Sequence, residues 1–251
     1  MKRKFLFLIT CLVLANYLSG QNIQKDSLQQ ANNNLTVDYK ALIIPTILIG
    51  YGVVGIESDG LKLFNSEIKE ELNEYVDEKL TADDFSQYAP FLTVYGLNAL
   101  GIKGKNSFKD RTIILGTAYL IMGSTVSGIK NIAAIERPDG SGKTSFPSGH
   151  TATAFMGAEF LYQEYKDISV WYGVAGYVVA TGTGFFRMYN DRHWFTDVVT
   201  GAGIGILSTK IAYWIHPWMK EKIFRNKKET TAMVVPFYNG KELGVSLSMS
   251  F

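Results

Sequence analysis

Apolar segments alternate with polar loops along most of this 251-residue chain. Most of the segments are close to the lower limit of roughly 17 to 25 residues that a helix needs to cross a bilayer, and several contain Gly or polar residues. The pattern predicts an all-α helical bundle, and by length alone it fits either membrane helices or the core of a soluble protein. The segments cover residues 41–56, 88–102, 112–129, 151–162, 168–186 and 198–218.

The two ends of the chain differ from this pattern. Residues 1–20 have a basic start, a short apolar stretch and small residues, which is typical of a secretory signal peptide; an uncleaved anchor is the alternative. Residues 21–39 are rich in Asn, Gln and Ser and are interpreted as a polar tether. We expect the helical domain to cover residues 40–218, followed by a basic tail and a short C-terminal β-hairpin in residues 219–251.

The hairpin is predicted from a turn and an alternating pattern. Asn239–Gly240 is a favoured two-residue hairpin turn. From Leu243 to Phe251, apolar residues alternate with Gly or Ser, as in a strand that buries one face. One hairpin is far too little for a membrane barrel.

The charge of the chain is small in total but unevenly distributed. A formal net charge of +2, with no basic run beside stacked aromatic residues, argues against a nucleic-acid partner. Stretches 103–111 and 220–228 are basic, whereas stretch 67–84 is acidic and predicts a solvated amphipathic helix. If the basic loops face the cytoplasm, the opposite helix ends, near Lys130 and Arg187, lie outside. We therefore expect an inner-membrane protein in the cell envelope, with these ends facing the periplasm.

Segment 41–56 affects this orientation. If it crosses the membrane in addition to an exported signal peptide, the parity of crossings reverses and the basic loops fall outside. Because the segment contains Pro45 and three glycines, we interpret it as an interfacial or re-entrant element, or as a packed core helix, rather than as a span. The single cysteine, Cys11, lies in the N-terminal apolar run and leaves no cysteine for disulfides or thiolate metal sites.

Three polar clusters stand at the ends of apolar segments. Taken singly, each has an ordinary structural explanation, because basic residues commonly anchor helices at an interface and a lone histidine is more often structural than catalytic. The clusters are Lys130 with Arg137, then Pro147–His150, and then Arg187 with His193 and Asp197.

Taken together, the clusters fit one phosphoryl ligand. His193 and Asp197 are four residues apart, so on a helix they share a face, and Asp197 can fix the tautomer of a nucleophilic imidazole. Ser148 can cap the helix that follows it, and the free N–H groups at a helix start bind anions. Two histidines suit a nucleophile and a general acid, while three fixed cations suit a phosphoryl group.

Two other kinds of site are less well supported. No set of His, Cys and carboxylate residues of suitable number accompanies the cations, so no metal is expected. A serine hydrolase is weaker still, because Ser148 is too close to His150 for the imidazole to serve readily as its base, and no nucleophile-elbow pattern is present.

In order and spacing, the three clusters resemble the three-part signature of the type 2 phosphatidic acid phosphatase family. That family also includes bacterial non-specific acid phosphatases and vanadium haloperoxidases. The resemblance covers roughly residues 112–218. One departure is Phe186, which stands where the family usually has Ser before the arginine, so the hydroxyl contact commonly made there is not carried over.

The resemblance implies an α-helical, membrane-embedded bundle and a mechanism without metal or cofactor. It implies that His193, oriented by Asp197, attacks phosphorus to give a phosphohistidine, and that His150 protonates the leaving oxygen and then deprotonates the hydrolytic water. His216 lies outside the clusters and is assigned to structure. The residues implied to bind the phosphate oxygens are Lys130, Arg137, Ser148, Gly149 and Arg187.

The expected function is therefore hydrolysis of a phosphate monoester or diphosphate of a lipid at the periplasmic face. Lipid A, a polyprenyl diphosphate and a glycerophospholipid are all candidate substrates, because loops 57–84 and 139–144 carry no recognisable motif for one headgroup. A soluble secreted acid phosphatase and a vanadium haloperoxidase are the alternative enzymes. From a different class comes a non-catalytic phospholipid-binding or envelope-scaffolding protein.

Overall fold

A computed structural model describes residues 39–74, 79–224, 231–238 and 243–250. The predicted signal peptide at residues 1–20 and the Asn239–Gly240 turn lie outside the described residues, as does nearly all of the predicted tether. The description below is confined to the part of the chain that the structure describes.

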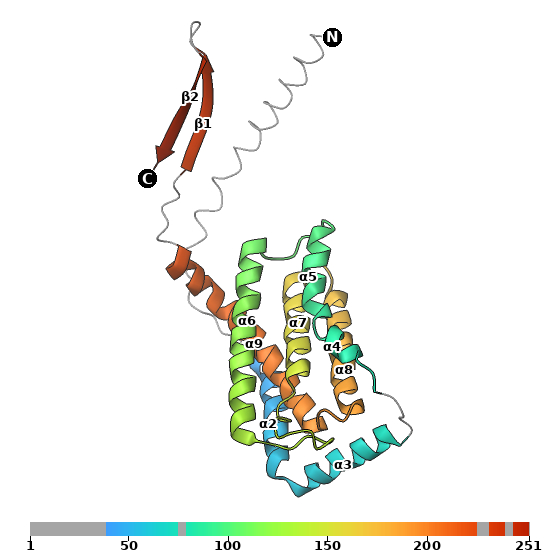
Figure 1. Ribbon diagram of the computed structural model, residues 1–251. Coiled ribbons are helices and arrows are strands. Elements are labelled where there is room, and N and C mark those ends of the chain that lie inside the picture. The colour runs from blue at the N-terminus through green and yellow to red at the C-terminus, as the bar shows by residue number, and fades with distance from the viewer. Residues whose placement is uncertain (1–38, 75–78, 225–230, 239–242, 251) are drawn as a thin grey trace, which may run out of the picture. The chain divides into compact units, whose positions relative to one another are not determined.

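Helices build the whole of the described region up to residue 224, so the all-α prediction is confirmed there (Figure 1). A single 3-10 turn, η2, leads into the first long helix. The elements are η2 Tyr39–Leu42, α2 Ile43–Glu57, α3 Asp59–Asn73, α4 Ala82–Ser86, α5 Ala89–Ala99, α6 Phe108–Ala133, α7 Gly149–Tyr165, α8 Val170–Tyr189 and α9 Phe195–Phe224.

Helix α7 is the most enclosed helix of the bundle. It packs against α5, α6, α8 and α9, and most of its side chains are buried. Small residues on several of its faces, such as Ala152, Ala154 and Ala158, let these neighbours approach closely. The Pro147–His150 stretch opens this helix, and the surrounding helices hold its start in place.

Helix α9 meets the backbone of α7 through two glycines one turn apart. A Cβ atom on Gly201 would lie 2.5 Å from the carbonyl oxygen of Ser148, and one on Gly205 would overlap the carbonyl oxygen of Ala152. Only glycine fits this close helix crossing, because it adds no atoms between the two backbones. The crossing brings the starts of α7 and α9 to the same end of the bundle.

Helix α2 packs against α9, which agrees with one of the interpretations of segment 41–56, a packed core helix; whether it spans a membrane stays open. It is one continuous helix, and Tyr39–Glu57 is long and apolar enough to cross a membrane. Pro45 lies in the first turn, where a missing N–H is tolerated. Gly52 and Gly55 do not break the helix but pack against Thr196 and Thr200 of α9. Helices Phe108–Ala133 and Phe195–Lys222 are also long and apolar enough to cross.

The acidic stretch forms two helices rather than one. Ser58 caps α3 by accepting a hydrogen bond from the N–H of Leu61 at 3.4 Å. Helix α3 crosses the end of the bundle at which α9 begins (Figure 1), and Asn65 bonds the N–H and the hydroxyl of Thr196 there. Helix α4 is short and separate, and it packs against α8.

Two strands follow the helices in sequence. β1 (Thr231–Tyr238) and β2 (Leu243–Ser250) pair antiparallel, with Thr231 opposite Ser250 and Tyr238 opposite Leu243.

We expect Gly205→Ala to lower the free energy of unfolding by about 2 to 3 kcal/mol, because its methyl group must push α9 away from the α7 backbone. Chemical unfolding in detergent micelles measures the change. The matched control is Gly123→Ala on α6, where a Cβ atom would meet no atom within 4 Å. Alanine there should leave stability unchanged or raise it slightly; equal losses in both variants would contradict the proposed crossing constraint.

Candidate active site

The three polar clusters of the sequence meet at one end of the helical bundle. Lys130 lies in the last turn of α6 and Arg187 in the last turn of α8. Ser148 precedes the first residue of α7, and Asp197 lies in the first turn of α9. The helix ends and the loops between them therefore bring together residues that are far apart in the sequence.

Asp197 is the buried acceptor that joins these segments. Its carboxylate oxygen Oδ2 accepts hydrogen bonds from the hydroxyl of Ser145 and from the backbone N–H of Trp194, the latter at 2.9 Å. Its backbone carbonyl oxygen accepts from the N–H of Ser148 at 3.0 Å. Only 1% of its side chain is exposed. Asp197 thus links the start of α9 to the segment that enters α7.

His193 lies beside Asp197, although the two do not share a helix as the spacing suggests. Helix α9 begins at Phe195, so His193 belongs to the turn before it. The distance from its Nδ1 to Oδ2 of Asp197 is 3.5 Å. Among the described residues this buried nitrogen has no partner in hydrogen-bond geometry. The proximity predicted from the sequence is present, but the turn supplies it rather than a helix face.

The surroundings of His193 favour its neutral form. Burial lowers the pKa of the imidazole to about 4, while the hydrogen-bonding tendency and charge of Asp197 act in the opposite direction. The nearby cations Lys130 and Arg187 lower the pKa further. The ring is therefore uncharged near neutral pH, as a nitrogen nucleophile must be.

The Ser148–His150 stretch forms the start of α7 as the sequence predicts. The Ser148 hydroxyl oxygen accepts from the N–H of Thr151 at 3.4 Å and lies 2.8 Å from the Thr151 hydroxyl. A Cβ atom on Gly149 would be 3.8 Å from Val126, an ordinary contact, so packing does not require glycine there. His150 is partly exposed, and its Nε2 lies 3.1 Å from Oδ1 of Asp84.

Two of the three predicted cations contact the loop that leads into α7. Lys130 donates to the carbonyl oxygens of Thr144 and Ser145, the second at 3.3 Å. Arg137 donates to the Thr144 hydroxyl at 3.4 Å. Burial, and next the positive charge of Arg187, lower the pKa of Arg137. The two guanidinium groups therefore repel each other electrostatically.

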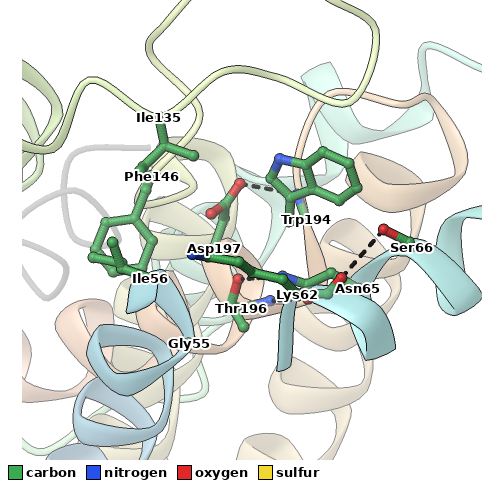
Figure 2. A pocket seen from close by; sticks show the side chains of 10 residues that line it. All are labelled: Gly55, Ile56, Lys62, Asn65, Ser66, Ile135, Phe146, Trp194, Thr196 and Asp197. Atoms are coloured by element: carbon green, nitrogen blue, oxygen red, sulfur yellow. Dashed lines mark hydrogen bonds between the residues drawn. The ribbon is translucent and has the colours of Figure 1, made fainter. Parts of the chain in front are cut away.

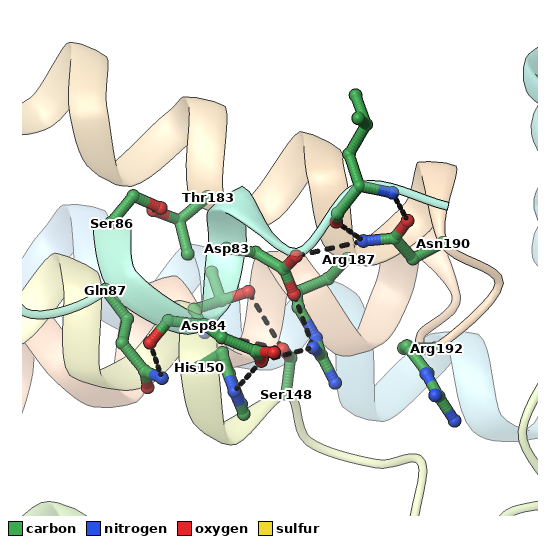
Figure 3. A network of polar contacts seen from close by, with 12 residues as sticks. Asp83, Asp84, Ser86, Gln87, Ser148, His150, Thr183, Arg187, Asn190 and Arg192 are labelled. Carbon is green, nitrogen blue, oxygen red and sulfur yellow. Dashed lines mark hydrogen bonds and ion pairs between the residues drawn. The ribbon is translucent and has the colours of Figure 1, made fainter. Parts of the chain in front are cut away.

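Arg187 has acidic partners that the sequence analysis did not identify (Figure 3). Its guanidinium pairs with the carboxylate of Asp83, which also accepts from the side-chain amide of Asn190 at 2.9 Å. Asp84 lies 3.7 Å from the same guanidinium. Both acids belong to α4, within the stretch interpreted as a solvated helix. Two adjacent acids are common on a surface helix, so the sequence carries no local signal for this contact.

Asp83, Asp84 and His150 also form a group that could hold a metal ion. Their ligand atoms all lie within 4.8 Å of one another. However, Arg187 already contacts both carboxylates and supplies positive charge where an ion would bind. A guanidinium in this place disfavours a second cation by repulsion.

A cavity of about 220 Å³ lies on the side of Asp197 that faces α2 and α3 (Figure 2). Neither His150 nor any of the three cations lines it. The cavity is therefore adjacent to the His193–Asp197 pair but separate from the cations. Its lining consists of Gly55, Ile56, Lys62, Asn65, Ser66, Ile135, Phe146, Trp194, Thr196 and Asp197.

The three clusters lie within a part of the chain that matches a known protein family. The model of the PAP2 superfamily, the type 2 phosphatidic acid phosphatases, matches residues 111–221, a range that contains every site residue predicted from the sequence. A lipid A 1-phosphatase of Porphyromonas gingivalis is 41% identical over 147 residues, which cover 57% of this chain. The chain matches only 32% of the length of that relative.

Two solved structures are similar in part. LpxE of Aquifex aeolicus is 23% identical, with a TM-score of 0.47, and the match covers 60% of this chain and 94% of that one. A transmembrane PAP2-type phosphatidylglycerolphosphate phosphatase of Bacillus subtilis is 18% identical, with a TM-score of 0.45, and the match covers 73% and 99%.

The buried neutral imidazole of His193 predicts a pH-dependent stability. Between pH 6.5 and about 4 the unfolded chain binds a proton that the folded chain does not, so stability falls as the pH is lowered through this window. The full shift corresponds to a loss on the order of 3 kcal/mol. We expect His193→Gln to lose this component. Unfolding of both proteins in detergent from pH 7 to 4.5 tests it; a constant difference between them would contradict the neutral, buried imidazole.

Proposed function

Because residues 111–221 belong to the PAP2 superfamily, we propose that this protein is a phosphatase that hydrolyses a phosphate monoester or diphosphate of a lipid. The observation that carries the proposal is the meeting of two histidines and three cations at one end of a bundle with exposed apolar faces. A nucleophile, a proton donor and a cationic anion site are the parts that phosphoryl transfer without a metal requires.

His193 is the proposed nucleophile. Its imidazole is buried and neutral, and its Nδ1 side faces the carboxylate of Asp197. This leaves Nε2 to attack phosphorus and form a phosphohistidine. As the bond forms, the imidazole gains positive charge, and Asp197, fixed by the Ser145 hydroxyl and the Trp194 N–H, stabilises that charge.

His150 is the proposed general acid and base. Its side chain is 32% exposed, so it can exchange protons with water between the two steps. Burial, and next the charge of Arg187, lower its pKa, whereas the hydrogen bond to Asp84 raises it. The imidazolium protonates the leaving oxygen, and the neutral ring then takes a proton from the water that attacks the phosphohistidine.

The phosphate oxygens are proposed to bind the three cations and the start of α7. A helix start presents free N–H groups, among them that of Gly149, and favours an anion. Arginine is suited to this task because its planar fork contacts two oxygens at once. The proposed binding residues are Lys130, Arg137, Ser148, Gly149 and Arg187.

A lipid substrate and a membrane location are supported by the surface of the helices. Large apolar side chains on α2, α6 and α8 are exposed, among them Leu120 at 76% and Trp171 at 73%. In water such faces would favour aggregation, whereas in a bilayer they contact acyl chains. The similar Porphyromonas protein is a lipid A 1-phosphatase, so lipid A heads the candidates, ahead of polyprenyl diphosphates and glycerophospholipids.

We propose that the site faces the periplasm from the inner membrane. The basic stretch 103–111 leads into α6, and Lys220 and Lys222 end α9, at the bundle end opposite the site. The positive-inside tendency places that end in the cytoplasm. A cleaved signal peptide at residues 1–20 would put the start of α2 outside and, with α2 crossing, reverse this orientation, so the signal peptide is not part of the proposal.

The function is tested by phosphate release from lipid A, undecaprenyl diphosphate and phosphatidic acid in mixed micelles. Wild-type protein should hydrolyse at least one of them, and His193→Gln should lower kcat/KM by roughly 10³-fold or more. The matched control is His216→Gln, because His216 pairs with Asp110 away from the site; its activity should stay within about twofold. Release from none of the lipids, with His193→Gln behaving like wild type, would refute the proposal.

The role of His150 is tested by the leaving group. His150→Gln should slow hydrolysis of a lipid or alkyl phosphate by about 10²- to 10⁴-fold, because the departing alkoxide needs a proton. It should slow hydrolysis of p-nitrophenyl phosphate far less, since that leaving group departs without protonation. The comparison uses kcat/KM for both substrates, because this constant reports the steps up to departure of the leaving group and not the later hydrolysis of the phosphohistidine. An equal loss of kcat/KM with both substrates would show that His150 does not act as the acid.

A further inference from the structure

The two adjacent acids of α4 stand in different environments within the proposed phosphate site (Figure 3). The Asp83 side chain is 2% exposed and is held by Arg187 and by the side-chain amide of Asn190. The Asp84 side chain is 53% exposed, yet its Oδ1 lies 3.1 Å from Nε2 of His150 and 3.7 Å from Nη1 of Arg187. One carboxylate oxygen thus bridges two residues that the proposed function assigns to the phosphate.

We propose that the Asp84 carboxylate competes with phosphate for the subsite between His150 and Arg187. The carboxylate occupies this subsite when no substrate is bound, and it returns there as inorganic phosphate leaves. The inference rests on the proposed function, since it takes both contacts of Asp84 as contacts of the substrate. It adds a residue outside the matched family region, with a role in product release.

The burial of the two acids determines which of them can move. Taking Asp83 out of its site would leave the Arg187 guanidinium buried without its closest partner, which is costly. Asp84 already has half of its side chain in water, so its departure loses only one partly exposed ion pair and one hydrogen bond to His150. Asp83 therefore stays and holds Arg187 in place, while Asp84 is the replaceable anion.

The charges of the site explain why a competitor is useful. Lys130, Arg137 and Arg187, together with a helix start, would bind inorganic phosphate tightly, because near neutral pH it carries between one and two negative charges and has several acceptor oxygens. A substrate phosphate displaces the single charge of Asp84 for the same reason. After hydrolysis, the carboxylate tethered next to the site competes with the product at a high effective concentration.

The test measures binding of inorganic phosphate to the full chain in detergent micelles by isothermal titration calorimetry. Asp84→Asn keeps the size of the side chain but removes its charge, and it should tighten phosphate binding by about tenfold. Asp84→Ala should tighten it similarly. The matched control is Asp167→Asn, which removes the same charge from an exposed aspartate just beyond the end of α7 that lies opposite the site; it should change the affinity by less than about twofold.

The direction in which the phosphate affinity changes distinguishes a competitor from a residue that only positions His150 or supports the fold. If Asp84 only positions His150 or supports the fold, its variants bind phosphate more weakly or equally, and the inference is overturned. If Asp167→Asn tightens phosphate binding as much as Asp84→Asn does, the effect is one of overall charge, and the inference is also overturned.

Product inhibition provides an independent readout. With any lipid phosphate that the wild type hydrolyses, the inhibition constant of inorganic phosphate should fall by about the same factor in Asp84→Asn. An unchanged constant in an active variant would refute the competitor and leave the proposed function intact. Absence of both hydrolysis and phosphate binding in the wild type would refute the proposed function itself, and the competitor with it.

Discussion

The contact between the glycines of α9 and the backbone of α7 is the constraint on which the site depends. Because no side chain separates the helices at Gly201 and Gly205, their starts lie close enough for the Ser148 N–H to bond the Asp197 carbonyl oxygen. This single hydrogen bond connects the start of α7, the proposed anion site, to Asp197 of α9, the acid proposed to orient His193. A wider crossing would separate the two halves of the chemistry, even if every site residue were kept.

Within that frame, the charges of the site neutralise one another. The cations Lys130 and Arg187 lie in the last turns of their helices, where positive charge is favoured by the helix dipole. Buried Asp83 compensates Arg187, and buried Asp197 is compensated by donors from Ser145 and Trp194. An empty site built from cations alone would carry a large desolvation cost, so its acids contribute to the fold as well as to the proposed reaction.

The sequence predicts the helical fold, and it predicts for a physical reason that the candidate residues lie together. Lys130, Ser148, Arg187 and Asp197 all stand where an apolar segment starts or ends, and the ends of antiparallel neighbours meet. The apolar pattern of the sequence shows which residues stand near a helix end. It does not show which distant segments contact each other. The pairing of Asp83 with Arg187 crosses 104 residues and leaves no local trace. Likewise, the glycines of α2 suggest an interrupted helix when the sequence alone is considered, and their role becomes clear only from their contacts with α9.

The site is thus bounded on one side by the tightly packed helices α7 and α9 and on another by the short helix α4. The crossing of α7 and α9 admits no added atom, whereas α4 is five residues long and presents Asp84 to water. For protein engineering, this separation means that the proposed catalytic residues and the exposed side of α4 can be changed independently. The exposed positions of α4, such as Asp84 and Phe85, are the ones to vary in a library that seeks a new headgroup preference, whereas Asp83 is kept because it is buried against Arg187.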